Sequence, residues 1–213
     1  MNVLIITGGK INLKFLQEFL HDNQFKIIIA VDKGLEILSK TKIRPNCIIG
    51  DFDSVNKKIL SKYENKDIKI IYLKPEKDFT DTHMALKQAI KLGAKNITIV
   101  GGIGTRVDHT LGNIHILKEA LENNVYAELI DQNNKIILIN QKTELTQNLR
   151  YKYISIIPLT TEVIGITLKG FKYSLENATL KIGESIGISN EATKRKLNIE
   201  IKQGIAILIY SKD

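Results

Sequence analysis

Three short acidic stretches carry the residues best suited to chemistry, and each follows a short apolar run. They are residues 50–54 (GDFDS), 78–81 (DFTD) and 101–109 (GGIGTRVDH). If the apolar runs are strands of a parallel sheet, their carboxyl ends meet at one edge, where ligands bind. Carboxylates, glycines and an arginine would then converge. This combination suits a magnesium-bound polyphosphate, because carboxylate oxygens bind the metal while backbone N–H groups and arginine bind phosphate.

Asp51 and Asp53 form the first acidic pair. They are two residues apart, so in an extended chain both side chains face the same side. Adjacent carboxylates repel each other unless a cation lies between them, and Gly50 would let the backbone bend closely around a ligand. The same residues could instead form a polar turn before a helix capped by Ser54. Both interpretations stay open at this point.

The second stretch has the features of a helix start. Thr80 is a good N-cap, and Asp81 would lie in the first helical turn, where the helix dipole favours an acid. That structural role would be sufficient by itself. However, Asp78 and Asp81 can share a face of the helix, and Lys77 beside them adds a charge that attracts phosphate. A functional role is favoured by the matching position after a strand.

The third stretch predicts an anion site. A strand, a glycine-rich turn with Gly102 and Gly104, and a helix together offer N–H groups and a helix dipole to phosphate, and Arg106 adds a planar fork. The stretch is neither a P-loop nor the dinucleotide-binding fingerprint, since it lacks the required lysine and last glycine. Asp108 could merely cap the helix, and His109 could be an ordinary surface or core histidine.

Further candidates follow two other predicted strands. Gly8 and Gly9 come after residues 3–7, and Asp32 comes after residues 28–31. A cluster of six acids at one sheet edge would be electrostatically costly unless a divalent metal is bound. The aspartates that follow predicted strands are Asp32, Asp51, Asp53, Asp78, Asp81 and Asp108.

The elements that must position these residues change in character along the chain. Over the first ~130 residues, apolar runs typical of strands alternate with segments whose apolar residues recur at helical spacing. This alternation predicts a doubly wound, mostly parallel sheet with helices on both faces. From about residue 135, short strands punctuated by glycines predict an antiparallel β-sandwich. The polar stretch 140–148 is expected to join them. We therefore expect an α/β domain at 1–140 and a β-sandwich domain at 141–213.

Composition limits the kind of partner. The net charge of +8, from 31 basic and 23 acidic residues, raises the question of nucleic-acid binding. The lysines are nevertheless spread along the chain with acids between them, and the densest cluster, 193–196, lacks aromatic residues for base stacking. The N-terminus does not resemble a signal peptide, and no apolar run approaches the length of a membrane span. We expect a soluble cytoplasmic protein with no nucleic-acid or membrane partner.

Motifs from both halves of the chain, taken together, resemble a known family. Residues 50–54 (GDFDS), 77–82 (KDFTDT) and 101–113 (GGIGTRVDHTLGN) closely resemble the bacterial thiamine pyrophosphokinase family. The C-terminal part agrees, because segments there resemble that family's β domain. These segments are 156–159 (IIPL), 165–170 (GITLKG), 173–175 (YSL) and 187–191 (GISNE). The resemblance runs through nearly the whole chain in order.

The resemblance implies a reaction and a set of roles. ATP and thiamine would give thiamine diphosphate and AMP with Mg²⁺, in a homodimer whose sites lie at the subunit interface. The resemblance implies that residues 1–140 form the catalytic, ATP-binding domain and residues 141–213 the domain for thiamine binding and dimerisation. Together with the residue patterns, it assigns catalysis to Asp51, Asp53, Asp81 and Arg106, with those three aspartates also holding metal. The expected ATP and phosphate contacts are Gly8, Gly9, Asp32, Lys77, Asp78, Thr80, Gly102, Gly104 and Arg106. The expected thiamine contacts are Asp108, His109, Ser189 and Asn190, the last two completing the partner's site.

Some positions depart from the family pattern, and two other functions compete. Lys33 and Thr105 stand where the family usually has glycine, and the chain has no tryptophan to stack on thiamine. One alternative is another Mg-dependent phosphotransferase or nucleotide hydrolase on the same scaffold. The other is a non-enzymatic, basic nucleic-acid-binding protein.

Overall fold

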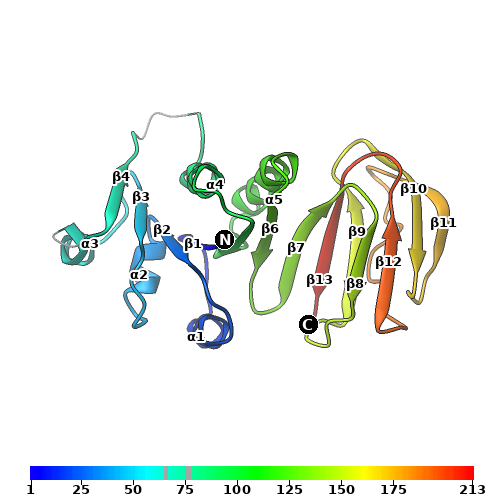
Figure 1. The fold of residues 1–213 in the computed structure, drawn as a ribbon, viewed down its shortest axis with the longest axis horizontal. Coiled ribbons are helices and arrows are strands. Elements are labelled where there is room, and N and C mark those ends of the chain that lie inside the picture. The colour runs from blue at the N-terminus through cyan, green and yellow to red at the C-terminus, as the bar shows by residue number, and fades with distance from the viewer. Residues whose placement is uncertain (65–66, 75–77) are drawn as a thin grey trace. The chain divides into compact units, whose positions relative to one another are not determined.

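The chain folds into two compact units. The computed structural model describes residues 1–64, 67–74 and 78–213, which divide into Met1–Gln132 and Asn133–Asp213. The predicted fold class is confirmed, since the first unit is a parallel sheet covered by helices and the second is built from antiparallel sheets (Figure 1). The first unit ends before residue 140 because β7 (Asn134–Ile139) pairs with β13 (Ala206–Ser211) and so belongs to the second unit.

The parallel strands of the first unit lie in the order β4-β3-β2-β1-β5-β6. Their bounds are β1 (Asn2–Ile6), β2 (Ile27–Val31), β3 (Cys47–Gly50), β4 (Lys69–Tyr72), β5 (Asn96–Val100) and β6 (Tyr126–Ile130). From β1 the chain moves outward to β4, then starts again on the other side of β1 with β5. This order creates a switch point between β1 and β5, and ligands of such sheets bind there, outside the carboxyl ends of the strands.

Helices cover both faces of this sheet (Figure 1). They are α1 (Leu13–Asp22), α2 (Gly34–Leu38), α3 (Lys57–Glu64), α4 (Asp81–Lys91) and α5 (Val107–Glu122). The predicted cap at Thr80 is confirmed, because its hydroxyl accepts a hydrogen bond from the His83 N–H at 3.2 Å. Asn12 caps α1 in the same way, and its side chain accepts a hydrogen bond from the Phe15 N–H at 3.1 Å. Within the described ranges, no helix is long and apolar enough to cross a membrane.

Burial on both faces explains why these strands are continuous apolar runs. Alternate residues of β1 point to opposite faces. Leu4 and Ile6 join a core cluster with Phe15 and Leu16 of α1, and Ile5, between them, is equally inaccessible to solvent. The sheet is therefore fixed in place from both sides, and its loops at the carboxyl ends are held on a rigid base.

The second unit consists of two antiparallel groups of strands, β7-β13-β9 and β11-β10-β12-β8. The remaining bounds are β8 (Thr143–Thr146), β9 (Tyr153–Pro158), β10 (Glu162–Lys169), β11 (Leu175–Lys181) and β12 (Lys196–Glu200). Apolar residues from both groups form one core cluster, as in a sandwich. Ile156 and Leu208 come from the first group, and Val163, Leu180 and Leu197 from the second.

The polar stretch 140–148, expected to be a linker, contains the edge strand β8. This strand pairs with β12, and its residue Leu145 packs against the sandwich core while Glu144 and Thr146 are exposed. An edge strand covered on one face needs few apolar residues, so a short polar one gives little hydrophobic signal in the sequence.

Candidate functional site

Two glycine turns meet at the switch point of the parallel sheet. Gly8 and Gly9 follow β1, and Gly101 begins the turn after β5 with a positive φ of 83°. A Cβ on Gly9 would lie 2.1 Å from the Gly101 carbonyl oxygen, so the two backbones touch where no side chain could fit. Thr7 locks this contact, because its N–H donates to the Val100 carbonyl at 2.9 Å and its hydroxyl to the Gly101 carbonyl at 3.0 Å.

A cavity of about 420 Å³ opens beside these turns, and we call it the glycine-turn cavity. Nine of the residues predicted from the sequence line it, drawn from loops after β1, β2 and β5 and from the start of α4. They are Gly8, Gly9, Asp32, Thr80, Asp81, Gly102, Gly104, Arg106 and His109. Residues far apart in the chain thus converge as the strand-end argument predicts. Further lining residues are Thr7, Lys10, Val31, Lys33, Ser54, Thr82, Gly101, Thr105 and Asn113.

Asp32 is the most strained acid of this cavity. It adopts a positive φ of 45°, and its carboxylate packs so closely on Gly50 that a Cβ there would lie 1.9 Å from Asp32 Oδ1. That oxygen is buried and has no hydrogen-bond partner within the described part of the chain. Burial, followed by the nearby carboxylates of Asp81 and Asp51, raises the pKa of Asp32 to about 7. An orphaned oxygen among acids is a site that a cation would stabilise.

The three aspartates expected to hold metal are not assembled as a three-ligand group. Among residues 1–64, 67–74 and 78–213, no three His, Cys, Asp or Glu side chains lie close enough together to hold a metal ion. Asp51 Oδ1 accepts the Asp53 N–H at 3.1 Å in a local turn, and the Asp53 side chain is exposed. The acids that act on one another electrostatically are Asp32, Asp81 and Asp51. The alternation rule does not apply to Asp51 and Asp53, because β3 ends at Gly50 and a turn follows.

Arg106 and Asp108 form an exposed pair at the start of α5. The guanidinium donates to Asp108 from Nη2 at 2.6 Å and from Nε at 3.2 Å, and these bonds lower the pKa of Asp108 to about 2. Arg106 lines the glycine-turn cavity, whereas Asp108 does not. Asp108 is therefore placed to orient the arginine, in addition to its first-turn position on the helix.

Two polar residues that sequence reasoning did not single out hold the glycine turn after β5. The buried Asn113 donates from Nδ2 to the Gly102 carbonyl at 2.8 Å. The Thr110 hydroxyl accepts the Gly104 N–H at 3.2 Å and donates to the Arg106 carbonyl at 3.2 Å. Asn113 could have been noticed in the sequence, because it is a polar residue among the apolar residues that form the buried face of this helix.

The remaining predicted residues of the first unit lie elsewhere. Asp78 is exposed and is not among the residues lining the glycine-turn cavity, and Lys77 lies outside the described residues. Lys10 and Lys33 contribute cationic side chains to the lining instead. The departure at Lys33 thus adds a positive charge beside the acids of the cavity.

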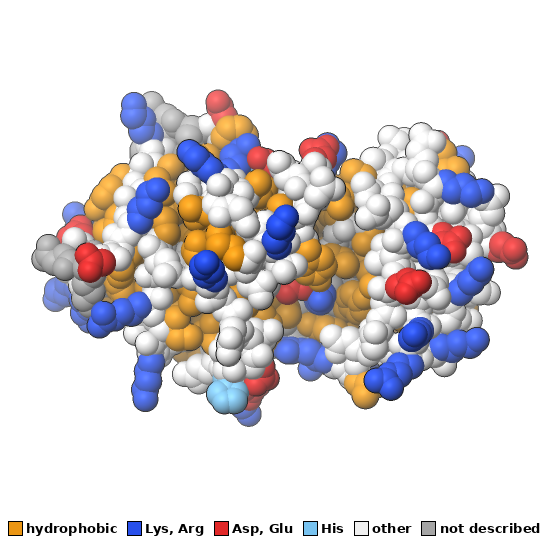
Figure 2. Space-filling view, in the orientation of Figure 1, with side chains coloured by type: hydrophobic (Ala, Val, Ile, Leu, Met, Phe, Trp, Pro, Cys, Tyr) orange, Lys and Arg blue, Asp and Glu red, His pale blue; other side chains and the backbone are white. Residues whose placement is uncertain are grey.

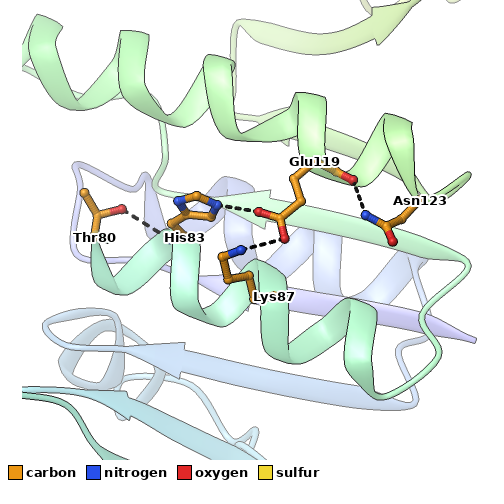
Figure 3. A network of polar contacts seen from close by, with 5 residues as sticks. All are labelled: Thr80, His83, Lys87, Glu119 and Asn123. Atoms are coloured by element: carbon orange, nitrogen blue, oxygen red, sulfur yellow. Dashed lines mark hydrogen bonds and ion pairs between the residues drawn. The ribbon is translucent and has the colours of Figure 1, made fainter. Parts of the chain in front are cut away.

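A polar network fixes α4, which carries Thr80 and Asp81, against α5 (Figure 3). Glu119 of α5 contacts His83 Nε2 at 2.6 Å through one carboxylate oxygen and Lys87 Nζ at 2.8 Å through the other. Phe79 adds an edge-to-face contact with His83, with ring centroids 4.9 Å apart. Burial opposes ionisation of Glu119, but the bonds from Lys87 and His83 outweigh it and hold its pKa below the usual value.

Removing this carboxylate should destabilise the contact between the helices. We expect Glu119→Ala to lower the free energy of unfolding by roughly 1–2 kcal/mol, because two partly buried donors lose their acceptor. Urea unfolding at pH 7 measures the loss. Because the pKa of Glu119 is lowered in the folded state, its contribution is present above the unfolded value and fades as the pH falls below about 4.

Glu122 provides the matched control on the same helix. It forms an exposed pair with Lys118 four residues earlier, so Glu122→Ala should change the unfolding free energy by less than about 0.5 kcal/mol. Equal losses in the two variants would contradict a bridging role for Glu119.

Ser189 and Asn190, expected to contact thiamine, lie in the second unit. Ser189 has a positive φ of 56°, and its N–H donates to the Ser155 hydroxyl at 2.9 Å. The Asn190 side chain is buried, accepts the backbone N–H groups of Tyr173 and Glu191, and donates to the Tyr173 carbonyl. Its amide therefore fixes a loop, and the exposed Ser189 is the better placed of the two to meet a ligand.

Family models match both units. The model described as "Thiamin pyrophosphokinase, catalytic domain" matches residues 20–129, which hold most of the residues that line the glycine-turn cavity. The model described as "Thiamin pyrophosphokinase, vitamin B1 binding domain" matches residues 138–206, which include Ser189 and Asn190.

Individual relatives agree over the whole chain. The thiamine pyrophosphokinase of Bacillus subtilis (strain 168) is 33% identical over 211 residues, 98% of each chain, and thiamin pyrophosphokinase 1 of Caenorhabditis elegans is 26% identical over 88% of this chain and 80% of its own. The crystal structure of the Bacillus subtilis enzyme superposes with a TM-score of 0.91 at 32% identity, covering 100% of both chains. That of Geobacillus thermodenitrificans gives 0.88 at 29% identity, covering 100% of this chain and 98% of the other. With two family models matched in order and these relatives aligned from end to end, the chain belongs to the thiamin pyrophosphokinase family.

Proposed function

We propose that this chain transfers the pyrophosphoryl group of ATP to the hydroxyl of thiamine, giving thiamine diphosphate and AMP. One observation supports the site in particular. The glycine turns at the switch point open onto a cavity that also contains Asp32, Asp81 and Arg106. The reaction is inferred from family membership, and the residues of this cavity carry the chemical groups that such a reaction needs.

The triphosphate would lie against the glycine turns. Their backbone approaches a ligand closely, and the N-terminus of α5 adds a positive dipole. Arg106, Lys10 and Lys33 line the same space with positive charge. These groups would bind the phosphates, hold them in line with the attacking hydroxyl and stabilise the charge that develops during transfer.

Asp32 and Asp81, which line the cavity, and Asp51, which acts electrostatically on Asp32, fit a magnesium ion bound together with the substrate. Mg²⁺ commonly takes one or two carboxylates from the protein and the rest of its oxygens from phosphates and water, so a preformed three-ligand cluster is not needed. Asp81 and Asp51, with Asp32 beside them, would hold the ion, which when bound neutralises charge on the phosphate oxygens. Asp53 would support this set through its backbone bond to Asp51.

The reaction itself requires one bond to form and one to break. The thiamine hydroxyl oxygen attacks the β-phosphorus of ATP, the bond from that phosphorus to the oxygen bridging it to the α-phosphorus breaks, and AMP leaves with that oxygen. The hydroxyl proton passes to a carboxylate of the Asp32, Asp51 and Asp81 group. The same carboxylates would attract the positively charged thiazolium ring of thiamine.

Thiamine binding would be completed by a second copy of the chain. Four large apolar residues near Ser189 are more than half exposed: Tyr173, Ile182, Ile186 and Ile188. Burying such side chains between two copies would be favourable, and we propose that this contact brings Ser189 to the partner's Asp108 and His109. We propose a cytoplasmic homodimer, which light scattering should report as about twice the mass of 24.0 kDa.

One assay tests the proposed function. The protein is incubated with ATP, Mg²⁺ and thiamine, and AMP and thiamine diphosphate are quantified by chromatography. Equal amounts of both products, formed only when thiamine is present, support the proposal. Breakdown of ATP without thiamine would instead indicate a hydrolase or a phosphotransferase with another acceptor.

A separate binding experiment tests the nucleic-acid alternative. On the face shown in Figure 2, lysine and arginine side chains are scattered among neutral and acidic ones and form no continuous patch among the residues drawn. We therefore expect no tight, salt-dependent binding of DNA or RNA. Such binding together with an absence of ATP turnover would refute the enzymatic proposal.

A further inference from the structure

The chain enters α4 through a short segment whose side chains serve two different places. Thr80 and Asp81 line the glycine-turn cavity. Phe79, the residue before them, is not among the lining residues, and its ring contacts side chains of α4 instead. Because Thr80 caps this helix, Phe79 occupies the position just before the cap. An apolar residue there commonly packs against the first turns of the helix and fixes the angle at which the chain enters it, an arrangement called a hydrophobic staple.

Phe79 makes this staple with two polar residues of α4. Its ring lies edge to face with the ring of His83, with the centroids 4.9 Å apart and the planes at 83°, and Lys87 Nζ lies 4.8 Å from the centroid of the Phe79 ring. His83 and Lys87 are four positions apart, so they are neighbours on one face of the helix. A cation over an aromatic ring is attracted to the face of the ring. Although Phe79 is 42% exposed, its ring is therefore held on α4 by two contacts.

Both contact residues are in turn held by Glu119 of α5 (Figure 3). One oxygen of this carboxylate contacts His83, and the other contacts Lys87. The same helix also supports another wall of the glycine-turn cavity, because Asn113 donates to the Gly102 carbonyl. The start of α4 and the glycine turn after β5 are therefore tied to one helix.

We propose that Phe79, His83 and Glu119 are positioning residues that set the place of Asp81 relative to the glycine turns. The inference rests on the proposed function and adds to it what holds one of its carboxylates in place. None of the three lines the cavity, so none is expected to touch a substrate. Because in-line transfer is sensitive to small displacements, loosening the start of α4 should slow the chemical step more than it weakens substrate binding.

Removing the ring of Phe79 tests this inference. We expect Phe79→Ala to lower kcat for thiamine-dependent AMP formation by roughly tenfold, with the KM values of thiamine and ATP changed by less than about twofold. Phe79→Tyr keeps the ring and should retain kcat within about twofold. Leu92→Ala is the matched control, since Leu92 lies at the other end of α4 and is 41% exposed. Its kinetics should equal those of the parent.

Two further measurements separate positioning from a merely structural role. If Phe79 and Glu119 act through the same contacts, the double alanine variant should lose about as much kcat as the more affected single variant, whereas independent losses would multiply. Hydrogen exchange without substrate gives a readout that does not depend on activity. The N–H groups of His83 and Met84 bond to Thr80, and we expect them to exchange roughly tenfold faster in Phe79→Ala than in the parent.

Several outcomes would overturn the inference, with all kinetics measured at a temperature at which thermal unfolding shows every variant to be folded. One is a kcat of Phe79→Ala within about twofold of the parent, or hydrogen exchange that does not change. A second is a raised KM at unchanged kcat, which would mean that Phe79 contacts a substrate. A third is multiplied losses in the double variant. Failure of the proposed function is separate, since it appears as absence of thiamine-dependent AMP formation in the unaltered protein.

Discussion

Asp81→Asn should lower kcat/KM for thiamine diphosphate formation by roughly 100-fold or more while the protein stays folded. Asp81 is the first residue of α4, lines the glycine-turn cavity and lies beside Asp32. Under the proposed function, replacing its carboxylate with an amide would weaken an oxygen ligand for Mg²⁺ and remove one source of attraction for the thiazolium ring. The loss should appear in steady-state assays of AMP formation at saturating Mg²⁺.

Stability should change little in this variant, because two effects oppose each other. An acid in the first helical turn is worth about 0.3–1 kcal/mol, which the amide forfeits, but repulsion with Asp32 is relieved. Asp22→Asn, at an exposed aspartate at the end of α1, serves as the matched control and should retain full turnover. Turnover of Asp81→Asn within a few-fold of the parent would reject the role given to Asp81.

Asp32→Asn should raise the stability of the protein while lowering its activity. The substitution is nearly isosteric, and asparagine tolerates the positive φ of this position. It removes a buried negative charge next to two others, and its amide can donate to a neighbouring carboxylate. We expect turnover to fall by roughly 100-fold, and the free energy of unfolding at pH 8 without divalent cations to rise by about 1–3 kcal/mol.

The pH dependence follows from the raised pKa of Asp32. Below about pH 4 the carboxyl is protonated in both the folded and unfolded states and carries no penalty. Between there and its folded pKa of about 7, the folded state retains a proton that the unfolded state has released, so the stability of the parent falls as pH rises. Denaturant unfolding at pH 4, 6 and 8 in EDTA should therefore show the advantage of Asp32→Asn growing with pH. An advantage independent of pH would contradict this account of Asp32.

The elements of the first unit were largely predictable because their signals are local. Asn12 and Thr80 stand at helix starts as capping chemistry requires, and apolar runs mark strands covered on both faces. Strand-end reasoning also brought Asp32, Asp81 and Arg106 to one cavity. This reasoning could not predict how the chain turns after each strand. Asp53 and Asp78 were predicted by the same reasoning, yet neither is among the residues that line the cavity, and the Asp53 N–H is engaged in a local turn with Asp51.

Residues that act through tertiary contacts were harder to find. Asn113 and Glu119 sit on α5, where each looks like an ordinary helical polar residue until the neighbouring turn or helix is known. Gln132 follows β6 and meets Asn12 across 120 positions of sequence. Asn190 carries a motif resemblance, but its amide is engaged with the backbone of its own loop. Spacing alone cannot separate a side chain that binds a ligand from one that supports a loop.

The backbone contact between Gly9 and Gly101 has an evolutionary consequence. Main-chain atoms are the same in every amino acid, so substitutions at neighbouring positions leave the shape of this contact largely unchanged. A Cβ on Gly9 or Gly101, in contrast, would meet backbone at 2.1 or 2.7 Å. We therefore expect almost any substitution of either glycine to be selected against, whereas the residues around them can vary.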